Sequence, residues 1–380
     1  MSGRLYVVAG EMSGDAHAAG LLEALLEMRP GLEVRGAGGP KMQAVAGMGI
    51  HDWLDQSAVM GVVEVLRHYS FFKESFERML KEVREWRPEV LLLVDYPGFN
   101  LRFAAAVRRE LPETRIVQYV CPQVWAWKKG RIPKMAALLD EVLCLLPFEP
   151  EVFEGSGLKA TFAGHPLIDE LTGERREMER VPQLVALLPG SRRPEIEKLL
   201  PVMLDAAVRM RMSRPELRFA IPAATPLLAT RIRELAEESG LGEALEIREG
   251  GAHFLMQEAA CGVVASGTAT VEAAFFGLPY CLVYKLAWPT YLVARVVVKI
   301  PRIGLINILA GETVVEELIQ SDADGCTIAA ALEDFLSHPE KAAELQQKMA
   351  GVIAKLGGTG AHRKAAGAVA AWFETPTRHA

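Results

Sequence analysis

The stretch LLPGSRRPEIEKLLP, residues 187–201, has the pattern of a strand that turns through a tight loop into a helix. An apolar run ends at Leu188, and the residues of Pro189–Ser191 are typical of a turn. Pro194 suits the first position of a helix. Apolar residues then recur every three or four positions from Ile196 onward. This spacing predicts that one face of the helix is buried against a sheet.

The turn within this stretch offers several hydrogen-bond donors to an anion. Gly190 lets the backbone approach a ligand closely, while Ser191, Arg192 and the free amides of the first helical turn can all donate. The pattern therefore favours a phosphate as the ligand. The competing interpretation is an ordinary strand-to-helix turn with two solvated arginines.

Apolar strands alternate with helical segments in both directions from this stretch. Such alternation is typical of α/β proteins, in which a parallel sheet is covered on both faces and ligands bind at the carboxyl ends of the strands. The charge-dense segment 169–183 has no strand signal and is the predicted linker. The predicted strands are 5–10, 32–39, 90–96, 115–120, 141–147 and 158–164 before the linker, and 184–189, 217–222, 244–250, 261–267 and 280–285 after it.

A chain of 380 residues is too long for one core of usual size, which agrees with two domains. We expect two Rossmann-like domains, 1–168 and 184–354, that face a central cleft where the ligands bind. The tail is rich in alanine and helix-like, so a C-terminal helix within about 355–380 is expected to pack on the first domain or on a partner.

Composition excludes several classes of protein. A net charge of -6 does not favour binding to a polyanion, so we expect no nucleic acid partner. Five cysteines without CxxC spacing are typical of reduced core residues in a cytosolic protein. The sequence has neither the pattern of a signal peptide nor about 20 consecutive apolar residues, so any membrane contact is expected to be peripheral.

Acidic residues follow two predicted strands of the first domain. Glu11, Ser13 and Asp15 come after the first strand, in a segment that lacks the GxGxxG spacing of a dinucleotide site. Asp95 ends an apolar strand, where partial desolvation would suit a general base for a sugar hydroxyl. The alternatives are that Asp15 caps the helix that this segment opens and that Asp95 forms an Asx turn before Pro97 and Gly98.

The second domain contains another candidate anion site after the predicted strand 261–267. Ser266, Gly267 and Thr268 could bind a phosphate, and Glu272 could accept hydrogen bonds from ribose hydroxyls. The alternative is a core helix with an ordinary N-cap. Histidines are scattered and no HExxH or calcium-loop pattern occurs, so the sequence predicts neither a metal site nor a cofactor.

The run 59–76 holds more apolar side chains than a surface segment needs. Met60, Val62 and Leu66 are candidates for contact with acyl chains or with a membrane surface. Basic residues in the surrounding segment are matched by glutamates, so charge does not favour membrane attraction. Packing in the core is the rival interpretation.

Nine motifs taken together resemble lipid-A-disaccharide synthase over nearly the whole chain. They are GEMSGD (10–15), AVMGVVEVL (58–66), DYPGFN (95–100), PQVWAWKKGR (122–131), LPFE (146–149), GHP (164–166), LLPGSR (187–192), ASGTATVEA (265–273) and NILAG (307–311). The resemblance implies a glycosyltransferase of the B-type fold, without a metal or cofactor. It would join UDP-2,3-diacylglucosamine to 2,3-diacylglucosamine 1-phosphate with inversion, giving a β-1,6-linked disaccharide 1-phosphate and UDP.

The resemblance also assigns roles to residues and domains. The first domain would bind the acceptor and lipid, and the second the UDP-sugar. Asp95 would deprotonate the acceptor 6-hydroxyl, with Glu11 beside the reacting sugars and a rival for the base. Arg192 and Asn307 would contact the nucleotide sugar, and the UDP pocket would be completed by Gly190, Ser191, Ser266 and Glu272. The family further suggests a homodimer with exchanged C-terminal parts, peripheral to the cytoplasmic face of the inner membrane.

The chain departs from the family pattern at three positions. Gly98 stands where the family often has a second acidic residue, which strengthens the case for Asp95. Ile306 and Glu316 stand where proline is frequent, which changes local loop shape. Two other classes remain open: a UDP-sugar 2-epimerase on the same fold, and a nucleotide-binding protein without enzymatic activity.

Overall fold

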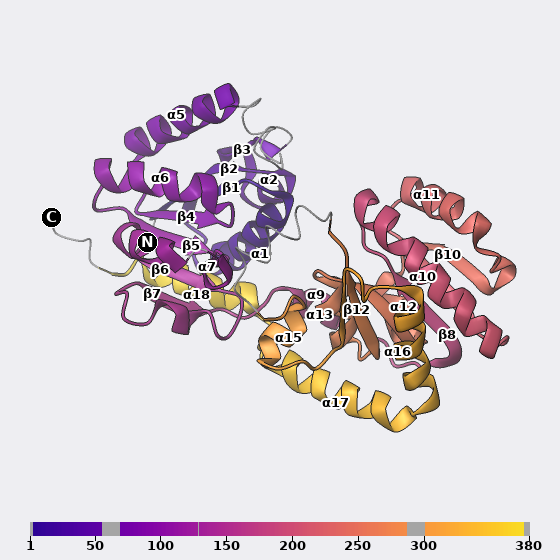
Figure 1. Cartoon of the computed structure of the whole chain (residues 1–380). Coiled ribbons are helices and arrows are strands. Elements are labelled where there is room, and N and C mark those ends of the chain that lie inside the picture. Colours follow the sequence, from indigo (N-terminus) through magenta and orange to yellow (C-terminus); the bar gives the residue numbers. More distant parts are fainter. Residues whose placement is uncertain (1–2, 55–68, 128, 287–300, 376–380) are drawn as a thin grey trace. The chain divides into compact units, whose positions relative to one another are not determined.

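The computed structural model describes residues 3–54, 69–127, 129–286 and 301–375. The chain divides into two compact units, which are Met1–Asp169 together with Leu356–Ala380, and Glu170–Lys355 (Figure 1). Each unit contains one parallel sheet with helices on both faces. This confirms the predicted α/β class and the alternation of strands and helices from which we inferred it.

The first unit is built on seven parallel strands in the order β3-β2-β1-β4-β5-β6-β7. These strands are β1 (Gly3–Ala9), β2 (Leu32–Gly38), β3 (Ile50–Asp52), β4 (Val90–Val94), β5 (Arg115–Tyr119), β6 (Glu141–Cys144) and β7 (Lys159–Phe162). All five residues of β4 are buried, because helices cover both faces of the sheet at its centre.

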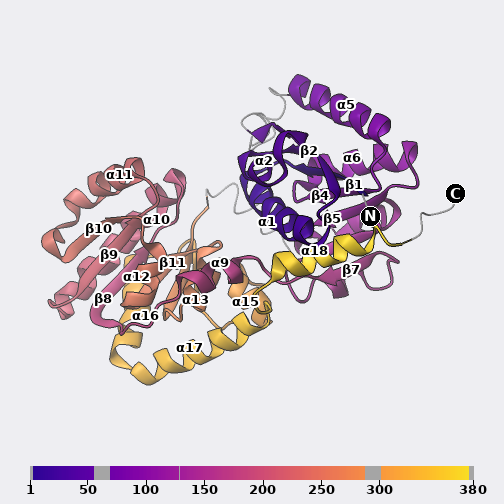
Figure 2. The same ribbon diagram turned by 180° about the vertical axis from the view of Figure 1, so that it is seen from behind.

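Two hydrophobic cores flank the first sheet. The core that we call the α1 core includes Leu21, Leu22, Leu92, Tyr119 and Val369, and the one that we call the α6 core includes Met79, Phe103, Val107, Met135 and Val142. The helices of this unit are α1 (Met12–Met28), α2 (Pro40–Ala46), α5 (Tyr69–Trp86), α6 (Pro97–Glu110), α7 (Val124–Trp127), α8 (Ile132–Leu138) and α18 (Ala361–Ala371), and α9 (Leu167–Glu174) leads into the second unit. Figure 2 shows α18 beside α1, so the end of the chain helps to cover the first sheet.

The second unit has six parallel strands in the order β10-β9-β8-β11-β12-β13. They are β8 (Val181–Leu188), β9 (Arg218–Ala223), β10 (Leu245–Glu249), β11 (Ala259–Ala265), β12 (Tyr280–Tyr284) and β13 (Glu317–Ile319). The surrounding helices are α10 (Arg193–Ser213), α11 (Pro226–Ala236), α12 (Ala252–Glu258), α13 (Ala269–Phe275), α15 (Leu305–Ala310), α16 (Gly325–Ser337) and α17 (Pro339–Ala354).

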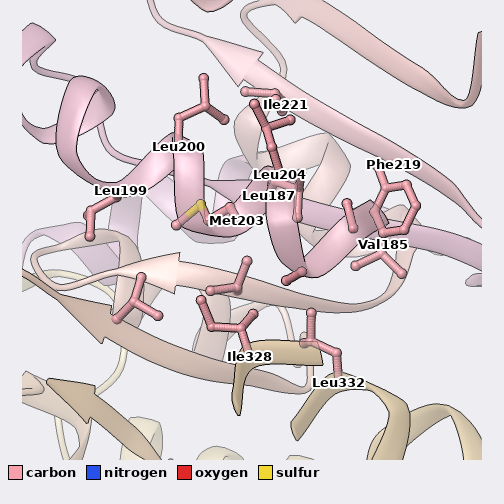
Figure 3. Close-up of a cluster of buried hydrophobic side chains, with 14 of the residues drawn as sticks. Val185, Leu187, Leu199, Leu200, Met203, Leu204, Phe219, Ile221, Ile328 and Leu332 are labelled. Atoms are coloured by element: carbon pink, nitrogen blue, oxygen red, sulfur yellow. The ribbon is translucent and has the colours of Figure 1, made fainter. Parts of the chain in front are cut away.

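The helix predicted from residue 194 onward is α10, which begins one residue earlier at Arg193. Its buried face follows the predicted spacing from Ile196. Figure 3 shows Leu200, Met203 and Leu204 of this helix meeting side chains of β8, β9 and α16. The apolar spacing thus fixes how the strand-turn-helix unit packs, and with it the position of the turn at residues 189–192.

Eleven strands were predicted, and each has a counterpart in the structure. The strands that the sequence did not predict, β3 and β13, are three residues long and lie at sheet edges. Four cysteines are buried as expected, whereas Cys326 is exposed near the start of α16.

Candidate active site

The strand order of the first sheet reverses between β1 and β4, and open α/β sheets bind ligands beyond the carboxyl ends of strands at such a point. Ala9 of β1 is in register with Val94 of β4. The residues that follow, Glu11 and Asp95, therefore leave the sheet on neighbouring strands. We call this region the Asp95 site.

The backbone at Asp95 has an uncommon conformation. Asp95 and Tyr96 both have left-handed backbones, with φ of 48° and 44°. The Asp95 amide donates to the Tyr119 carbonyl oxygen over 2.9 Å. Its own carbonyl oxygen accepts from the side-chain nitrogens of Asn100 at 2.8 Å and Gln118 at 3.0 Å. Residues held in such sparsely populated regions cluster at functional sites, where surrounding contacts over-determine them.

Burial raises the pKa of the Asp95 carboxyl group above its ordinary value of 3.8, and the backbone amide of Tyr96 opposes part of this shift. The cause is desolvation, which penalises the charged carboxylate. A carboxylate with a raised pKa is a stronger proton acceptor than one with an ordinary pKa. Asp95 is therefore a partly desolvated carboxylate at the point where the strand order of the first sheet reverses.

The loop after β1 approaches Tyr96, the neighbour of Asp95, because Gly10 has no side chain. A Cβ on Gly10 would lie 2.3 Å from Cδ1 of Tyr96. The pKa of Tyr96 is raised by burial and, to a lesser extent, by the negative charge of Glu11. Glu11 therefore has its charge within electrostatic reach of the Asp95 site.

The start of α1 lies on this side of the sheet. Glu11 is the N-cap residue, and its side chain makes no capping hydrogen bond. Ser13 is exposed in the first turn. Backbone amides at such a helix start point toward a ligand and favour negative charge.

Asp15, the third polar residue of this loop, has a structural role. Its carboxylate is 2% exposed and accepts from the backbone amides of Gly39, Lys41 and Met42 over 2.8 to 3.1 Å. These amides belong to the start of α2, so Asp15 caps a neighbouring helix. The sequence suggested that Asp15 caps the helix that its own segment opens, whereas in the structure it lies within α1 and caps α2.

The strand order of the second sheet reverses between β8 and β11, and a cavity of about 350 Å³ lies at this point. We call it the Gly190 pocket. Loops after both strands line it, together with the start of α12 and the loop after β9. Eight site residues were predicted in the second unit, and all except Asn307 line this cavity. These seven are Gly190, Ser191, Arg192, Ser266, Gly267, Thr268 and Glu272.

One wall of the pocket is the turn into α10. Gly190 has φ of 106°, and a Cβ there would lie 2.5 Å from Oε2 of Glu195, so another residue would be strained. Arg192 is the N-cap residue, and its side chain makes no capping hydrogen bond. That side chain is 66% exposed and pairs with Glu195 over 3.5 Å. Exposed ion pairs are weak, so an anionic ligand can compete for Arg192.

Glu272 also lines the pocket, and it pairs with His253, which the sequence did not identify as a site residue. Nε2 of His253 lies 3.3 Å from Glu272, and its Nδ1 lies 2.7 Å from Glu174. Hydrogen bonds to these two carboxylates raise the pKa of His253 to about 9, although partial burial opposes the shift. His253 is therefore a cation at neutral pH, and it orients the Glu272 carboxylate beside the pocket.

Asn307 differs from its predicted role at the nucleotide sugar. It is fully buried, and its Nδ2 donates to the carbonyl oxygen of Val315 at 2.7 Å and to Glu317 at 2.8 Å. Its Oδ1 accepts from the amides of Val314 and Val315, both at 2.9 Å. All four hydrogen-bonding positions of the carboxamide are thus used within the second unit. The structure gives Asn307 a role in holding the segment before β13.

The predicted acyl or membrane residues Met60, Val62 and Leu66 lie outside the described residues. At the end of the same run, Phe71, Phe72 and Phe76 pack against the α6 core. Trp53 lies among these rings, 6.3 Å from Phe71 and 6.4 Å from Phe72 between centroids. This part of the run contributes to the core. Within the described parts of the chain, no helix is long and apolar enough to cross a bilayer.

Solved structures share this fold across almost the whole chain. A UGT transferase from Siraitia grosvenorii in complex with UDP has a TM-score of 0.61 at 10% sequence identity, covering 99% of this chain and 100% of that one. A UDP-GlcNAc 2-epimerase from Neisseria meningitidis bound to UDP-GlcNAc has a TM-score of 0.55 at 12% identity, covering 92% and 94%. At these identities the likeness concerns the fold, which is that of the B-type glycosyltransferases and related epimerases.

Sequence comparison narrows this class to one family. The family model described as lipid-A-disaccharide synthetase matches residues 5–371. A lipid-A-disaccharide synthase of Geobacter sulfurreducens is 36% identical over 378 residues, which is 97% of each chain. The chain belongs to the lipid-A-disaccharide synthetase family, whose members are glycosyltransferases of lipid A biosynthesis.

Proposed function

We propose that this chain joins UDP-2,3-diacylglucosamine to 2,3-diacylglucosamine 1-phosphate and releases UDP. The observation that carries the proposal is Asp95, a partly desolvated carboxylate at the switch point of the first sheet, in a chain of this family. The first unit binds the acceptor and its acyl chains. The second unit binds the donor through the Gly190 pocket.

In the proposed reaction the Asp95 carboxylate accepts the proton of the acceptor 6-hydroxyl as its oxygen attacks C1 of the donor sugar. The C1–oxygen bond to UDP breaks, and the electron pair leaves with the diphosphate. Attack on the face opposite to the leaving group inverts C1 and gives the β-1,6 linkage. Glu11 and Ser13, at the start of α1, contact the reacting sugars.

The leaving diphosphate needs donors that stabilise its growing negative charge. Ser191, Arg192 and the amides at the start of α10 supply them on one wall of the Gly190 pocket. Ser266, Gly267 and Thr268 supply further donors on the other wall, and Glu272 accepts from the ribose hydroxyls. No step in this scheme uses a metal or a cofactor.

Two further parts of the proposal concern partners and location. Because both substrates carry acyl chains, the enzyme works at the cytoplasmic face of the inner membrane, with peripheral contact through Met60, Val62 and Leu66. The enzyme acts as a homodimer with exchanged C-terminal parts. Sedimentation with liposomes and light scattering of the purified protein test these two statements separately.

The reaction is tested by incubating the purified protein with UDP-2,3-diacylglucosamine, with and without the acceptor. The proposal requires disaccharide 1-phosphate and UDP in equal amounts, and only when the acceptor is present. An epimerised donor formed without acceptor would identify a UDP-sugar 2-epimerase instead. Binding of the nucleotide sugar without any product would identify a nucleotide-binding protein without this activity.

A further inference from the structure

Two thiols and a carboxylate meet at the carboxyl edge of the first sheet, in residues that the proposed reaction does not use. Cys121 follows β5, Cys144 ends β6, and Glu149 lies in the loop after β6. One ligand atom from each residue lies within 4.8 Å of the other two. The three residues are 5%, 0% and 2% exposed, respectively. We call this group the Cys121 cluster.

The two cysteines face each other because the chain breaks its alternation after β5. Ile116 of this strand packs into the α6 core and Tyr119 into the α1 core, so a regular strand would turn Cys121 toward the α1 core. Val120, however, has a left-handed backbone with φ of 65°, which is uncommon for a β-branched residue. Val120 packs against the α1 core instead, and Cys121 joins Cys144 in the α6 core.

The carboxylate of the cluster is fixed in advance by three donors. Oε1 of Glu149 accepts from the indole nitrogen of Trp125 at 3.1 Å. Oε2 accepts from the backbone amides of Leu145 at 3.1 Å and Leu146 at 3.0 Å. These bonds hold the side chain in one orientation beside the thiols, so little conformational entropy is lost when it binds a further partner.

The thiols have weaker partners at present. Sγ of Cys121 donates to the carbonyl oxygen of Pro122 over 3.3 Å, and Sγ of Cys144 lies 3.9 Å from the carbonyl oxygen of Val142. Deprotonation of Cys121 is opposed by its hydrogen bond to Cys144, by burial and by the negative charge of Glu149, which raise the pKa of the thiol, so the metal must displace the thiol proton. A disulfide would need the two thiols alone, whereas an oriented carboxylate beside them adds a third ligand for a cation.

We propose that Cys121, Cys144 and Glu149 bind a thiophilic divalent cation of the Zn²⁺ class. Two thiolates and one carboxylate supply three ligands of a tetrahedral site, and a water molecule takes the fourth position. Sulfur ligands about 2.3 Å from the metal are roughly 3.8 Å apart, so small side-chain rotations suffice. Binding forms two metal–sulfur bonds and one metal–oxygen bond, and it releases the two thiol protons to solvent.

Cadmium is a suitable probe, because a Cd²⁺–thiolate bond gives a charge-transfer band in the ultraviolet. The full-length protein, kept reduced by a phosphine, is titrated with Cd²⁺. We expect the band to saturate at one equivalent and to be lost in both Cys121→Ser and Cys144→Ser. Glu149→Gln should weaken binding by about tenfold or more, and Cys326→Ser, which changes an exposed thiol, should leave it unchanged.

A second measurement on the unchanged protein covers the case in which a serine variant fails to fold. Cd²⁺ should slow alkylation of Cys121 and Cys144 together, as followed by peptide mass spectrometry, without protecting Cys326. Protection of Cys261 and Cys281, the buried thiols of the second unit, would overturn the assignment. A wild-type protein that gives neither the band nor protection would overturn the site itself.

Discussion

Asp95 has its unusual backbone because its neighbours use their hydrogen bonds to hold it. Asn100 and Gln118 are fully buried, and both direct their side-chain nitrogens at the Asp95 carbonyl oxygen. Within the described residues, the side-chain oxygens of these two amides are buried without a partner. Each unpaired buried acceptor costs roughly 1 to 3 kcal/mol. Two of these costs therefore fall next to the carboxylate that the proposed reaction uses.

The first prediction concerns Asp95 as the general base. Asp95→Asn keeps the shape of the side chain but removes the carboxylate that takes the proton, so turnover should fall by about 10² to 10⁴. UDP binding should hardly change, because the proposed contacts with UDP belong to the second unit. Initial rates and UDP titrations check both expectations. Near-normal turnover in Asp95→Asn, with activity lost in Glu11→Gln, would make Glu11 the base.

The same substitution should stabilise the fold. Burial raises the folded-state pKa of Asp95, so the folded state binds more protons than the unfolded state between the two pKa values. Ionisation of Asp95 with rising pH therefore removes stability, and the loss is complete above the folded-state pKa. Asn avoids this loss and tolerates a left-handed backbone.

We expect Asp95→Asn to have a higher Tm than the wild type at neutral pH, with the difference shrinking as the pH is lowered toward 3.8. Calorimetry at several pH values measures this difference. Asp205→Asn is the matched control, because Asp205 is exposed on α10. A difference that stays constant with pH would argue against desolvation of Asp95.

Arg192 and Arg193 offer a comparison between adjacent arginines. Arg192 lines the Gly190 pocket, whereas Arg193 pairs with Glu197 along α10. Arg192→Ala should lose a charge-assisted contact with the diphosphate worth roughly 1.5 to 3 kcal/mol, or about ten- to a hundredfold in UDP affinity or rate. Calorimetric titration with UDP measures the change. Equal losses in Arg192→Ala and Arg193→Ala would mean that only general positive charge matters.

At the scale of elements, the sequence predicts what depends on local pattern. The strands β1, β4 and β8 are apolar runs bounded by turn residues, so periodicity identifies them, whereas β3 and β13 are too short to produce a pattern. The loops that line the Gly190 pocket follow strands β8 and β11, and strand order brings them together. Placing candidate residues at strand ends was therefore enough to find this pocket.

Contacts between distant elements could not be predicted in this way. Asp15 follows β1 but caps α2, and Asn307 lies in α15 but binds backbone groups before β13. Neither partner has a fixed spacing in sequence. His253 gave no signal because its role depends on where α12 and α13 place their side chains. Such roles require tertiary structure, because one polar residue type serves both scaffolds and ligands.

The bridge made by His253 between α13 and Glu174 predicts a pH effect on stability. Its partners raise the pKa of His253 from 6.5 to about 9. The bridge therefore stabilises the fold fully below pH 6.5, and this contribution is lost as the pH rises through about 9. Urea unfolding of the wild type should show a larger loss of stability across this range than that of His253→Gln.

The control for this experiment is His338→Gln, which removes an exposed histidine that pairs with Asp334 within α16 and its C-cap. It should follow the wild type across the same pH range. If His253→Gln loses as much stability as the wild type, the charge of His253 does not contribute to the fold, and its pairing with Glu272 is incidental.

At the scale of the whole molecule, the chain leaves the first unit, builds the second, and returns to finish the first. The returning segment is fixed at both ends of α18. Asp169 accepts from the amides of Gly360 and Ala361 at the start of the helix, and Trp372 donates to Oε2 of Glu141 after it, over 2.6 Å. Thr161 and Lys159 contact the other oxygen of Glu141. Since Glu141 is fully buried, Trp372 satisfies one oxygen of a carboxylate that water cannot reach. The C-terminal segment is thus part of the first unit's stability.

Because the Gly190 pocket belongs to the second unit and Trp372 to the first, we expect UDP and a substitution at Trp372 to change hydrogen exchange in different units. A ligand at about 100 times its Kd stabilises the structure that binds it by about 2.7 kcal/mol. UDP should therefore slow hydrogen exchange in the loops 188–195 and 265–272 of the Gly190 pocket.

Trp372→Phe keeps an aromatic ring but removes the donor to Glu141, which should cost roughly 1 to 3 kcal/mol. It should speed exchange in α18, β6 and β7.

Hydrogen exchange with mass spectrometry measures both effects in one set of peptides. Trp86→Phe is the control, because Trp86 ends α5 and stacks with Arg35 at a centroid distance of 4.8 Å, away from α18. It should leave exchange in α18 unchanged. UDP protection that appears around Asp95 and is absent from 188–195 would move the nucleotide site to the first unit. If α18 exchanges at the same rate in Trp372→Phe and in the wild type, the hydrogen bond to Glu141 does not hold the C-terminal segment in place.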